Sequence, residues 1–271
     1  MTIEFEHVAK TYPDGTVGVG DVTLTVRSGE LMVLVGPSGS GKTTLMRMIN
    51  RMVEPTAGHV LIDGSDVRDR DPIALRRSIG YVIQGGGLLP HRSVVDNIAT
   101  VPMLNGVRRS RARRLAMDLL DKVGLDTSLA GRYPSQLSGG QRQRVGVARA
   151  LAADASILLM DEPFSAVDPV VRRDLQREVR RVRRETGATV VFVTHDINEA
   201  LFLADRIALL GKGGVIEQVG TPSQILDEPA SDAVRAFVEA GRPSVGTGVV
   251  GGGGTAAGPI EPDLQPIGEE A

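Results

Sequence analysis

Four short apolar segments constrain the fold of this chain more than any other feature. Each is four or five residues long and carries almost only hydrophobic side chains. Such runs are typical of strands buried on both faces of a parallel sheet. Because three of them are followed by segments with helical spacing, they predict an α/β fold whose parallel sheet is covered on both faces. The apolar segments are Leu31–Val35, Ile157–Met160, Thr189–Val193 and Ile207–Leu210, and the helices are expected over Thr43–Arg51, Pro169–Thr186 and Ile197–Ala204.

The rest of the chain divides into a β region, a helical insertion and a tail. Residues 88–152 show helical spacing, which predicts a helical subdomain inserted into a domain of residues 1–240. Residues 241–271 are rich in Gly and Pro and end with acidic residues, which predicts a disordered tail. Further strands are expected over Ile3–Val8, Asp21–Val26 and Ile79–Ile83, with a hairpin-like turn at residues 62–64.

The composition argues against several classes of protein. The sequence has no run of 18 or more apolar residues, no apolar signal core near its first residue, and no cysteine. These features favour a cytoplasmic protein. The net charge of −2 gives no overall basic footprint, so nucleic acid is not an expected partner.

Arginine is concentrated in two segments, residues 108–114 and 172–184. We expect both to be solvated helix faces, because Asp174 and Glu178 lie four positions apart among the second group, as paired charges on a helix surface do. The alternative is a surface that contacts anionic lipid or a partner protein.

A loop suited to bind phosphate follows the first apolar segment. Residues 36–43 match the pattern G-x-x-x-x-G-K-[ST] between a predicted strand and a predicted helix. Glycines let the backbone curve around an anion, and the following helix adds its positive end. Lys42 is expected to reach the β and γ phosphates of a nucleotide and Thr43 to bind Mg²⁺. The expected nucleotide contacts are Gly36, Pro37, Ser38, Gly39, Ser40, Gly41, Lys42, Thr43 and Thr44.

An acidic pair, Asp161 and Glu162, ends the second apolar segment. In an open α/β sheet the carboxyl ends of the strands face the ligand. Asp161 is therefore expected to hold Mg²⁺, directly or through water, and Glu162 to polarise a water for in-line attack on the γ phosphate. The alternative, an acidic pair that simply ends a strand at the surface, fits less well beside the phosphate loop.

Six motifs follow one another in an order that resembles one family. LSGGQ at residues 137–141 is the ABC signature, and the order is GPSGSGKTT, then Gln84, LSGGQRQRV, ILLMDEP, SAVD, and His195 after TVVFVT. Over about residues 1–240 the chain resembles the nucleotide-binding subunit of an ABC transporter. The resemblance implies a P-loop NTPase of the ABC type with a RecA-like parallel-sheet core, an antiparallel β subdomain and the helical insertion. It also implies that the protein binds ATP and Mg²⁺ and hydrolyses ATP.

The same resemblance assigns roles to single residues. Tyr12 would stack on adenine, the alternative being a residue that packs at a strand end. Gln84 would sense Mg²⁺ and the attacking water, Asp168 would link two active sites, and His195 would contact the γ phosphate. The expected catalytic residues are Glu162, His195 and Gln84, and the expected metal contacts are Thr43, Gln84 and Asp161.

The signature implies a second copy of the chain. Ser138 is expected to cap a helix that begins at Gly139 and Gly140, and this helix end would form a second anion site with Gln141. The family uses that site against the γ phosphate held by another subunit, so two copies would enclose two ATP molecules. The helical insertion and the Gln84 segment would receive a helix from membrane-spanning permease subunits at the cytoplasmic face of the membrane. An extracytoplasmic substrate-binding protein would be an indirect partner.

Within that family, several stretches resemble the importers of osmoprotectants such as glycine betaine, carnitine, choline and other quaternary amines. An amino acid, a polyamine or an anion is the alternative substrate. An exporter subunit, or a soluble ABC ATPase that acts on ribosomes or DNA, is the alternative function. The stretches are Ile79–Gln84, Leu88–His91, Val145–Arg149 and Asp161–Pro169.

Two features depart from the family pattern. Gly85, Gly86 and Gly87 stand where relatives usually have larger residues, so the loop after Gln84 is expected to be unusually flexible. About 30 residues follow the ATPase region, too few for the paired CBS modules of many relatives. Regulation through such modules is therefore not expected.

Overall fold

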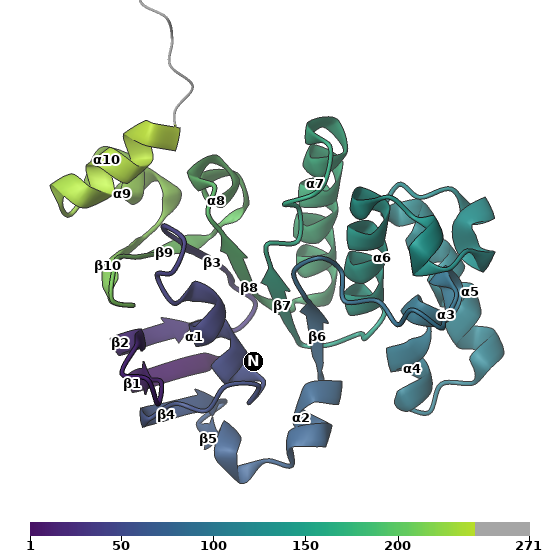
Figure 1. Ribbon diagram of the computed structural model, residues 1–271, viewed down its shortest axis with the longest axis horizontal. Coiled ribbons are helices and arrows are strands. Elements are labelled where there is room, and N and C mark those ends of the chain that lie inside the picture. Colours follow the sequence, from purple (N-terminus) through teal and green to yellow (C-terminus); the bar gives the residue numbers. More distant parts are fainter. Residues whose placement is uncertain (242–271) are drawn as a thin grey trace, which may run out of the picture.

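The computed structural model describes residues 1–241, in which two sheets are accompanied by helices (Figure 1). The tail predicted from the composition lies outside these residues from position 242 onward. Among the helices of residues 1–241, none is both long enough and apolar enough to cross a membrane.

The smaller sheet is antiparallel, with the strand order β2-β1-β4-β5. Its two long strands extend the segments expected near the amino terminus, whereas β4 is not predicted by the sequence pattern. The turn between β4 and β5 has φ of 50° at Asp63 and 74° at Gly64, as two-residue hairpins require, which confirms the hairpin-like turn. The strands are β1 (Ile3–Thr11), β2 (Val17–Val26), β4 (Ala57–Ile62) and β5 (Ser65–Asp66).

The larger sheet has the order β10-β9-β3-β8-β7-β6. Its strands β9, β3, β8, β7 and β6 pair in parallel, and β10 runs antiparallel to β9 at one edge. All four apolar segments are strands of this sheet, so the predicted parallel sheet is confirmed. The strands are β3 (Leu31–Val35), β6 (Ile79–Val82), β7 (Ile157–Asp161), β8 (Thr189–Thr194), β9 (Arg206–Leu210) and β10 (Ile216–Gly220).

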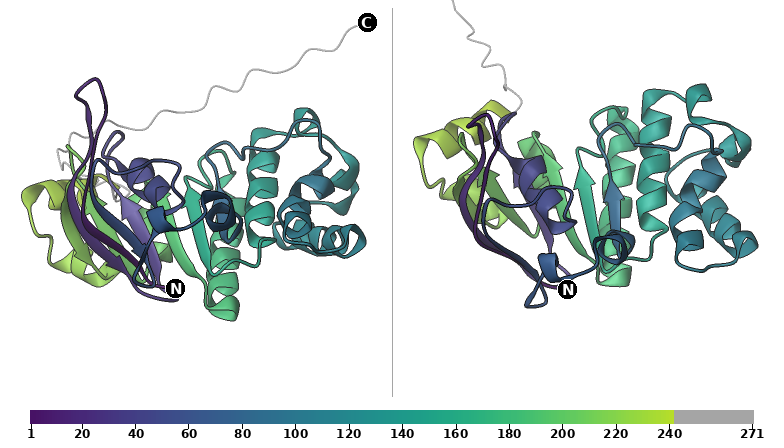
Figure 2. Two further views of the ribbon diagram at one scale, coloured as in Figure 1. Left: turned by 90° about the horizontal axis from the view of Figure 1, so that it is seen from below. Right: turned by 60° about the horizontal axis from the view of Figure 1, so that its bottom comes forward.

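The helices fall into two groups. Helices α3 to α6 lie within residues 88–152, where the sequence predicts a helical insertion, and they form one end of the molecule (Figure 2). Helices α2, α9 and α10 are not predicted by the sequence pattern. The bounds are α1 (Lys42–Ile49), α2 (Pro72–Arg77), α3 (Val94–Ile98), α4 (Thr100–Leu104), α5 (Arg109–Lys122), α6 (Gly139–Leu151), α7 (Pro169–Thr186), α8 (Ile197–Leu203), α9 (Pro222–Asp227) and α10 (Asp232–Gly241), with short 3₁₀ helices at Val67–Asp69, Thr127–Gly131 and Pro134–Gln136.

Strand β3 is buried on both faces. Its residues Leu31, Val33 and Val35 belong to one hydrophobic cluster, whereas Met32 and Leu34 belong to another. The second cluster also takes in side chains of α1 and of the antiparallel sheet, so α1 lies between the two sheets (Figure 2). The first cluster takes in side chains of α6, α7 and α8 on the other face. Both faces of the parallel sheet are therefore covered, as predicted.

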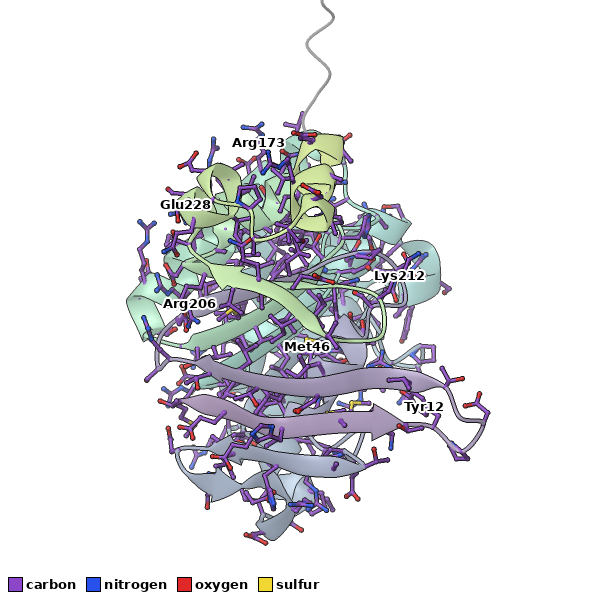
Figure 3. All side chains as sticks on the ribbon, turned by 90° about the vertical axis from the view of Figure 1, so that its left-hand side faces the viewer. Tyr12, Met46, Arg173, Arg206, Lys212 and Glu228 are labelled. Carbon is purple, nitrogen blue, oxygen red and sulfur yellow. The ribbon has the colours of Figure 1, made fainter. Side chains whose placement is uncertain are left out.

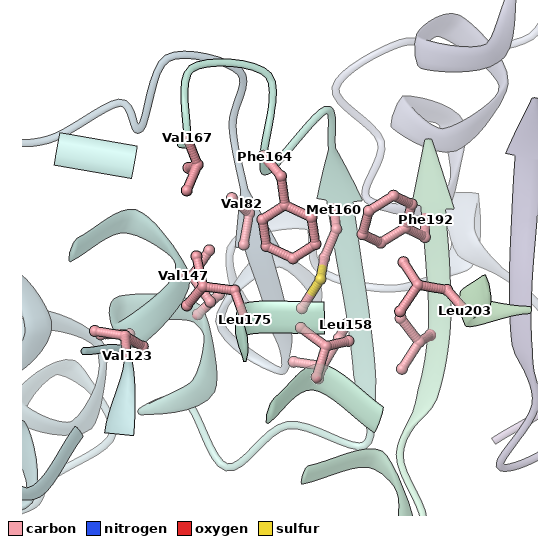
Figure 4. Close-up of a cluster of buried hydrophobic side chains, with 14 of the residues drawn as sticks. Val82, Val123, Val147, Leu158, Met160, Phe164, Val167, Leu175, Phe192 and Leu203 are labelled. Carbon is pink, nitrogen blue, oxygen red and sulfur yellow. The ribbon is translucent and has the colours of Figure 1, made fainter. Parts of the chain in front are cut away.

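Two aromatic rings occupy the middle of the first cluster (Figure 4). The ring centroids of Phe164 and Phe192 are 5.6 Å apart, and their planes are tilted by 44°. Met160 and Leu203 lie beside them. Because Phe164 follows β7 and Phe192 belongs to β8, this contact fixes the loop after β7 against the sheet.

We expect Phe192→Ala to lower the free energy of unfolding by about 3–5 kcal/mol, because the truncation leaves a cavity in a closely packed core. Phe202→Ala is the control, since Phe202 is 37% exposed; it should cost less than about 1.5 kcal/mol. Urea unfolding of both variants measures the difference. Equal losses in the two variants would contradict this account of the core.

Candidate functional site

The loop between β3 and α1 curves at positions that only glycine fits. Gly41 has φ of 81°, and a Cβ atom there would lie 2.2 Å from the carbonyl oxygen of Gly18. Gly36 has φ of 150°, and its Cβ atom would lie 2.1 Å from the carbonyl oxygen of Leu210. The loop therefore packs against β2 and against the end of β9 without room for side chains, and this closeness keeps it in one shape.

The ammonium group of Lys42 lies on the inner side of this loop. It donates to the carbonyl oxygens of Gly36 at 2.8 Å and Pro37 at 2.7 Å, and to Ser40 Oγ at 3.3 Å. The side chain is buried, and burial lowers the pKa of Lys42, although the charges of Glu162 and Asp161 partly oppose this. A cation held this way is ready to pair with an anion that enters the loop.

Thr43 and Asp161 place two oxygen atoms side by side. Thr43 Oγ1 donates to Asp161 Oδ1 at 2.7 Å, and a guanidinium nitrogen of Arg47 lies 3.4 Å from Asp161 Oδ2. Asp161 is almost fully buried, and burial raises its pKa despite the hydrogen bond from Thr43 and the charge of Arg47. A hydroxyl and a carboxylate suit Mg²⁺, which takes few protein ligands and completes its shell with phosphate and water. The two residues therefore fit the predicted ion. Arg47 is a contact that sequence reasoning missed.

Glu162 gathers the other predicted catalytic residues around it. Its Oε1 lies 3.3 Å from His195 Nδ1, and its Oε2 accepts from Gln84 Nε2 at 3.4 Å. Glu162 follows β7, His195 follows β8 and Gln84 follows β6, so the three meet at the carboxyl edge of adjacent parallel strands. Gln84 contacts Glu162 here, and its role as a metal contact stays a prediction.

A cavity of about 360 Å³ joins Lys42 and Thr43 of the phosphate loop to Glu162, whereas Asp161, Gln84 and His195 do not line it. Tyr12 lies at its border, with its hydroxyl 3.3 Å from Thr44 Oγ1, and Lys10 Nζ lies 5.5 Å from the centre of the Tyr12 ring. Figure 3 shows Tyr12 near one end of the antiparallel sheet. Residues 16–18 also line the cavity, and no motif in that stretch marks them in advance. The predicted contacts on its wall are Tyr12, Ser38, Gly39, Gly41, Lys42, Thr43, Thr44 and Glu162.

The signature segment begins a helix away from this cavity. Ser138 Oγ accepts from the main-chain nitrogen of Gln141 at 3.2 Å, and Gln141 Oε1 accepts from that of Ser138 at 2.9 Å. This capping box confirms Ser138 as the N-cap of α6. Ser138 and Gly139 are exposed, and the wall of the cavity does not include them. Asp168 is also exposed, and it caps α7 by accepting from the main-chain nitrogen of Val170.

The three glycines after Gln84 are held more firmly than their composition suggests. Arg149 of α6 donates to the carbonyl oxygens of Gly86 at 3.0 Å and Gly87 at 2.8 Å. A Cβ atom at Gly86 would lie 2.8 Å from the carbonyl oxygen of Arg142, and one at Gly146 would lie 3.0 Å from that of Gly86. The glycines let the backbone pack directly on α6, and the expected flexibility of the loop stays a prediction.

Comparison with known proteins places the chain in a family. Residues 19–165, more than half of the chain, match the family described as ABC transporter. The chain belongs to the ABC transporter family. It is 49% identical over 236 residues to the carnitine transport ATP-binding protein of Listeria monocytogenes, across 87% of this chain and 59% of that protein. It is 50% identical over 235 residues to the glycine betaine uptake system ATP-binding protein of Escherichia coli, across 87% of this chain and 76% of that protein.

A solved structure shares the fold of this ABC protein. It is a dimeric ATP-binding cassette in a post-hydrolysis state bound to ADP and Pi, 35% identical, with a TM-score of 0.77 over 81% of this chain and 98% of that one. The predicted α/β fold of the ABC type is thereby confirmed. The chain spans less than two thirds of the length of the Listeria relative.

The raised pKa of Asp161 predicts a pH-dependent stability. Between the ordinary aspartate pKa and the raised one, the folded protein keeps a proton that the unfolded chain has lost, so stability falls as pH rises through this range. Asp161→Asn keeps an acceptor for Thr43 and does not titrate. Without nucleotide or Mg²⁺, the free energy of unfolding of the variant relative to the wild type should increase as the pH rises from the ordinary aspartate pKa of 3.8 through the raised one. Urea unfolding across this range tests it, and a pH-independent difference would contradict it.

Proposed function

We propose that this chain is the ATP-binding and ATP-hydrolysing subunit of an ABC importer. The observation that carries the proposal is the position of Glu162. Its carboxylate shares one cavity with Lys42 and Thr43 of the phosphate loop and is contacted by Gln84 and His195. In this arrangement Lys42 can hold the phosphates and Glu162 can activate a water. Gln84 and His195 can orient the Glu162 carboxylate.

The chain's own residues divide the work of hydrolysis. Lys42 exchanges the loop carbonyls for the β and γ phosphates, and the amino-terminal end of α1 faces the same charge. Thr43 and Asp161 would hold Mg²⁺, which would supply positive charge to neutralise the phosphates. Glu162 accepts a hydrogen bond from the attacking water and polarises it, while Gln84 and His195 fix the direction of the carboxylate. Tyr12 contributes an aromatic face for the adenine at the border of the cavity.

The exposed signature supports a dimer. Ser138 and the start of α6 offer a hydroxyl and free main-chain N–H groups to an anion, and they lie apart from the chain's own phosphate loop. A second copy packed head to tail brings each signature to the other copy's ATP, with Asp168 at the contact between the two sites. The similarity to a dimeric cassette is consistent with this assembly.

The further partners are permease subunits and, through them, an extracytoplasmic substrate-binding protein. The helical end of the molecule has a hollow of about 430 Å³, a few residues beyond the Gln84 loop. We assign this region to a permease helix at the cytoplasmic face of the membrane. It is lined by residues 91–93, Asp96, Met103, Arg109 and Tyr133.

The transported solute is a quaternary amine such as glycine betaine, carnitine or choline. The proposal rests on similarity to ATP-binding proteins of carnitine and glycine betaine uptake. A quaternary ammonium group is recognised by aromatic cages, and only 3% of this chain is aromatic. The solute is therefore recognised by the partner subunits. Another small solute, such as an amino acid, is the second candidate because the ATPase site itself is indifferent to it.

We expect Glu162→Gln to accumulate an ATP-bound dimer, since the phosphate loop is intact while the activation of water is lost. Lys42→Ala is the contrasting variant and should weaken ATP binding at least about tenfold, because it removes the buried cation. Size-exclusion chromatography with ATP and titration with a fluorescent ATP analogue measure the two effects. A Glu162→Gln protein that stays monomeric with bound ATP would contradict its role.

The substrate is tested by reconstituting the full chain with its permease and binding-protein partners in proteoliposomes. The rate of ATP hydrolysis should rise several-fold when glycine betaine, carnitine or choline is added to the reconstituted complex. This rise should vanish in Glu162→Gln. Stimulation by an amino acid, polyamine or anion instead would remove the quaternary-amine assignment and keep the ATPase.

A further inference from the structure

The backbone of Glu162 has a conformation that its own residue type does not favour. Its φ is 45°, in the left-handed region that glycine enters freely and other residues enter at a cost. Such a conformation persists only where the surroundings impose it. One support comes from β8, whose Val193 carbonyl accepts a hydrogen bond from the main-chain nitrogen of Glu162 at 3.0 Å. The other side of the residue is held by α6.

Gln143 of α6 provides this second support. Its Nε2 donates to the main-chain carbonyl oxygen of Glu162 at 2.7 Å and lies 3.3 Å from Ser165 Oγ. Its Oε1 accepts from the main-chain nitrogen of Ala166 at 2.9 Å. The amide therefore spans the turn of residues 162–166 and binds both of its ends.

The position of Gln143 is costly for a polar residue unless its hydrogen bonds are made. It is fully buried, and a buried amide without partners is strongly unfavourable. An apolar side chain would pack equally well in this place but would leave the Glu162 carbonyl and the Ala166 nitrogen with fewer partners. The amide of Gln143 therefore stabilises the turn of residues 162–166 through hydrogen bonds that an apolar side chain would not make.

Helix α6 also holds the loop that carries Gln84, which contacts the Glu162 side chain. Arg149 binds the carbonyls of Gly86 and Gly87, just after Gln84, and Gln84 contacts the Glu162 carboxylate. One helix, whose N-cap is Ser138, is thus hydrogen-bonded to the backbone of Glu162 and to the loop that carries Gln84. A displacement of α6 would reach Glu162 by both routes.

We propose that Gln143 is a positioning residue for ATP hydrolysis: from the signature helix it fixes the strained turn that aims the Glu162 carboxylate. The inference rests on the proposed ATPase function. It assigns Gln143 no contact with nucleotide, so its effect is expected on the rate of hydrolysis and hardly at all on ATP binding.

The test is Gln143→Met in the full chain, which conserves volume and removes the hydrogen bonds to Glu162, Ser165 and Ala166. We expect kcat for ATP hydrolysis to fall at least about tenfold, because a small misplacement of a catalytic group has a large effect on rate. The Kd for a fluorescent ATP analogue should stay within about threefold of wild type, and ATP-bound dimer should accumulate as in Glu162→Gln. Gln143→Glu keeps an acceptor for Ala166 but loses the donor to Glu162, and it should lower kcat similarly.

Gln218→Met is the matched control. Gln218 also bridges two main-chain groups, donating to the carbonyl of Glu228 at 2.9 Å and accepting from the nitrogen of Ala230 at 2.9 Å, but on β10. Its substitution should leave kcat within about twofold of wild type. An equal loss of kcat in the two variants would overturn the proposal, since both would then act only through stability.

A double variant separates positioning from other effects. If Gln143 acts through Glu162, adding Gln143→Met to Glu162→Gln should change the residual rate by less than about twofold. A further tenfold loss would overturn the inference. Should Gln143→Met fail to fold, Gln143→Glu is measured in its place, since it also removes the donor to the Glu162 carbonyl, and wild-type kcat in that variant would overturn the inference too.

The two proposals can fail separately. A wild-type chain that binds ATP but does not hydrolyse it, alone or with permease subunits, would overturn the ATPase function and this inference with it. A wild-type chain that hydrolyses ATP, together with a Gln143→Met variant of unchanged kcat, would overturn the positioning role alone.

Discussion

The parallel pairing of β3, β8, β7 and β6 is the constraint on which the site depends. Parallel strands end at the same edge of a sheet, and each of these strands is followed there by a group of the site. The phosphate loop follows β3, His195 follows β8, Glu162 follows β7 and Gln84 follows β6. None of these groups lies near another in the sequence. These groups meet because of the order of the strands in the sheet. Two clusters of buried hydrophobic side chains, which form no part of the phosphate site, maintain that order.

Two opposite charges of the site, Lys42 and Asp161, lie close to each other. Lys42 and Asp161 are both buried, and burial shifts the pKa of each toward its neutral form. Arg47 partly offsets the cost of burial for Asp161, whereas the charge of Glu162 adds to it; for Lys42 the charges of Glu162 and Asp161 partly offset it.

The sequence predicts those parts of the fold and the site that depend on local pattern. The four apolar strands, the phosphate loop and the Ser138 cap are each specified by a few adjacent residues, and the structure contains all of them. The neighbours of Glu162 follow from motif order and the rule that ligands meet strand ends. What sequence reasoning missed depends on contacts between distant segments. Arg47 beside Asp161 carries no local mark, since an arginine on a helix is usually a surface residue. Gln143 lies within the motif LSGGQRQRV, but nothing in the motif indicates its contact with Glu162. The firm packing of Gly86 was missed because glycine alone gives no indication of what lies against it.

The two hydrophobic clusters fix the register of strand β3 in the sheet. Its odd-numbered side chains belong to one core and its even-numbered side chains to the other, so neither face is free to tolerate a shift. A slip of one residue against β8 and β9 would exchange every side chain between the two cores. It would also carry the phosphate loop forward by about 3.3 Å, the rise of one residue in a parallel strand. A shift of this size would break the hydrogen bonds that the loop makes. It would also move Gly36 away from its close contact with Leu210. The packing that prevents a shift in the register of β3 therefore also fixes the distance from the phosphate loop to Glu162.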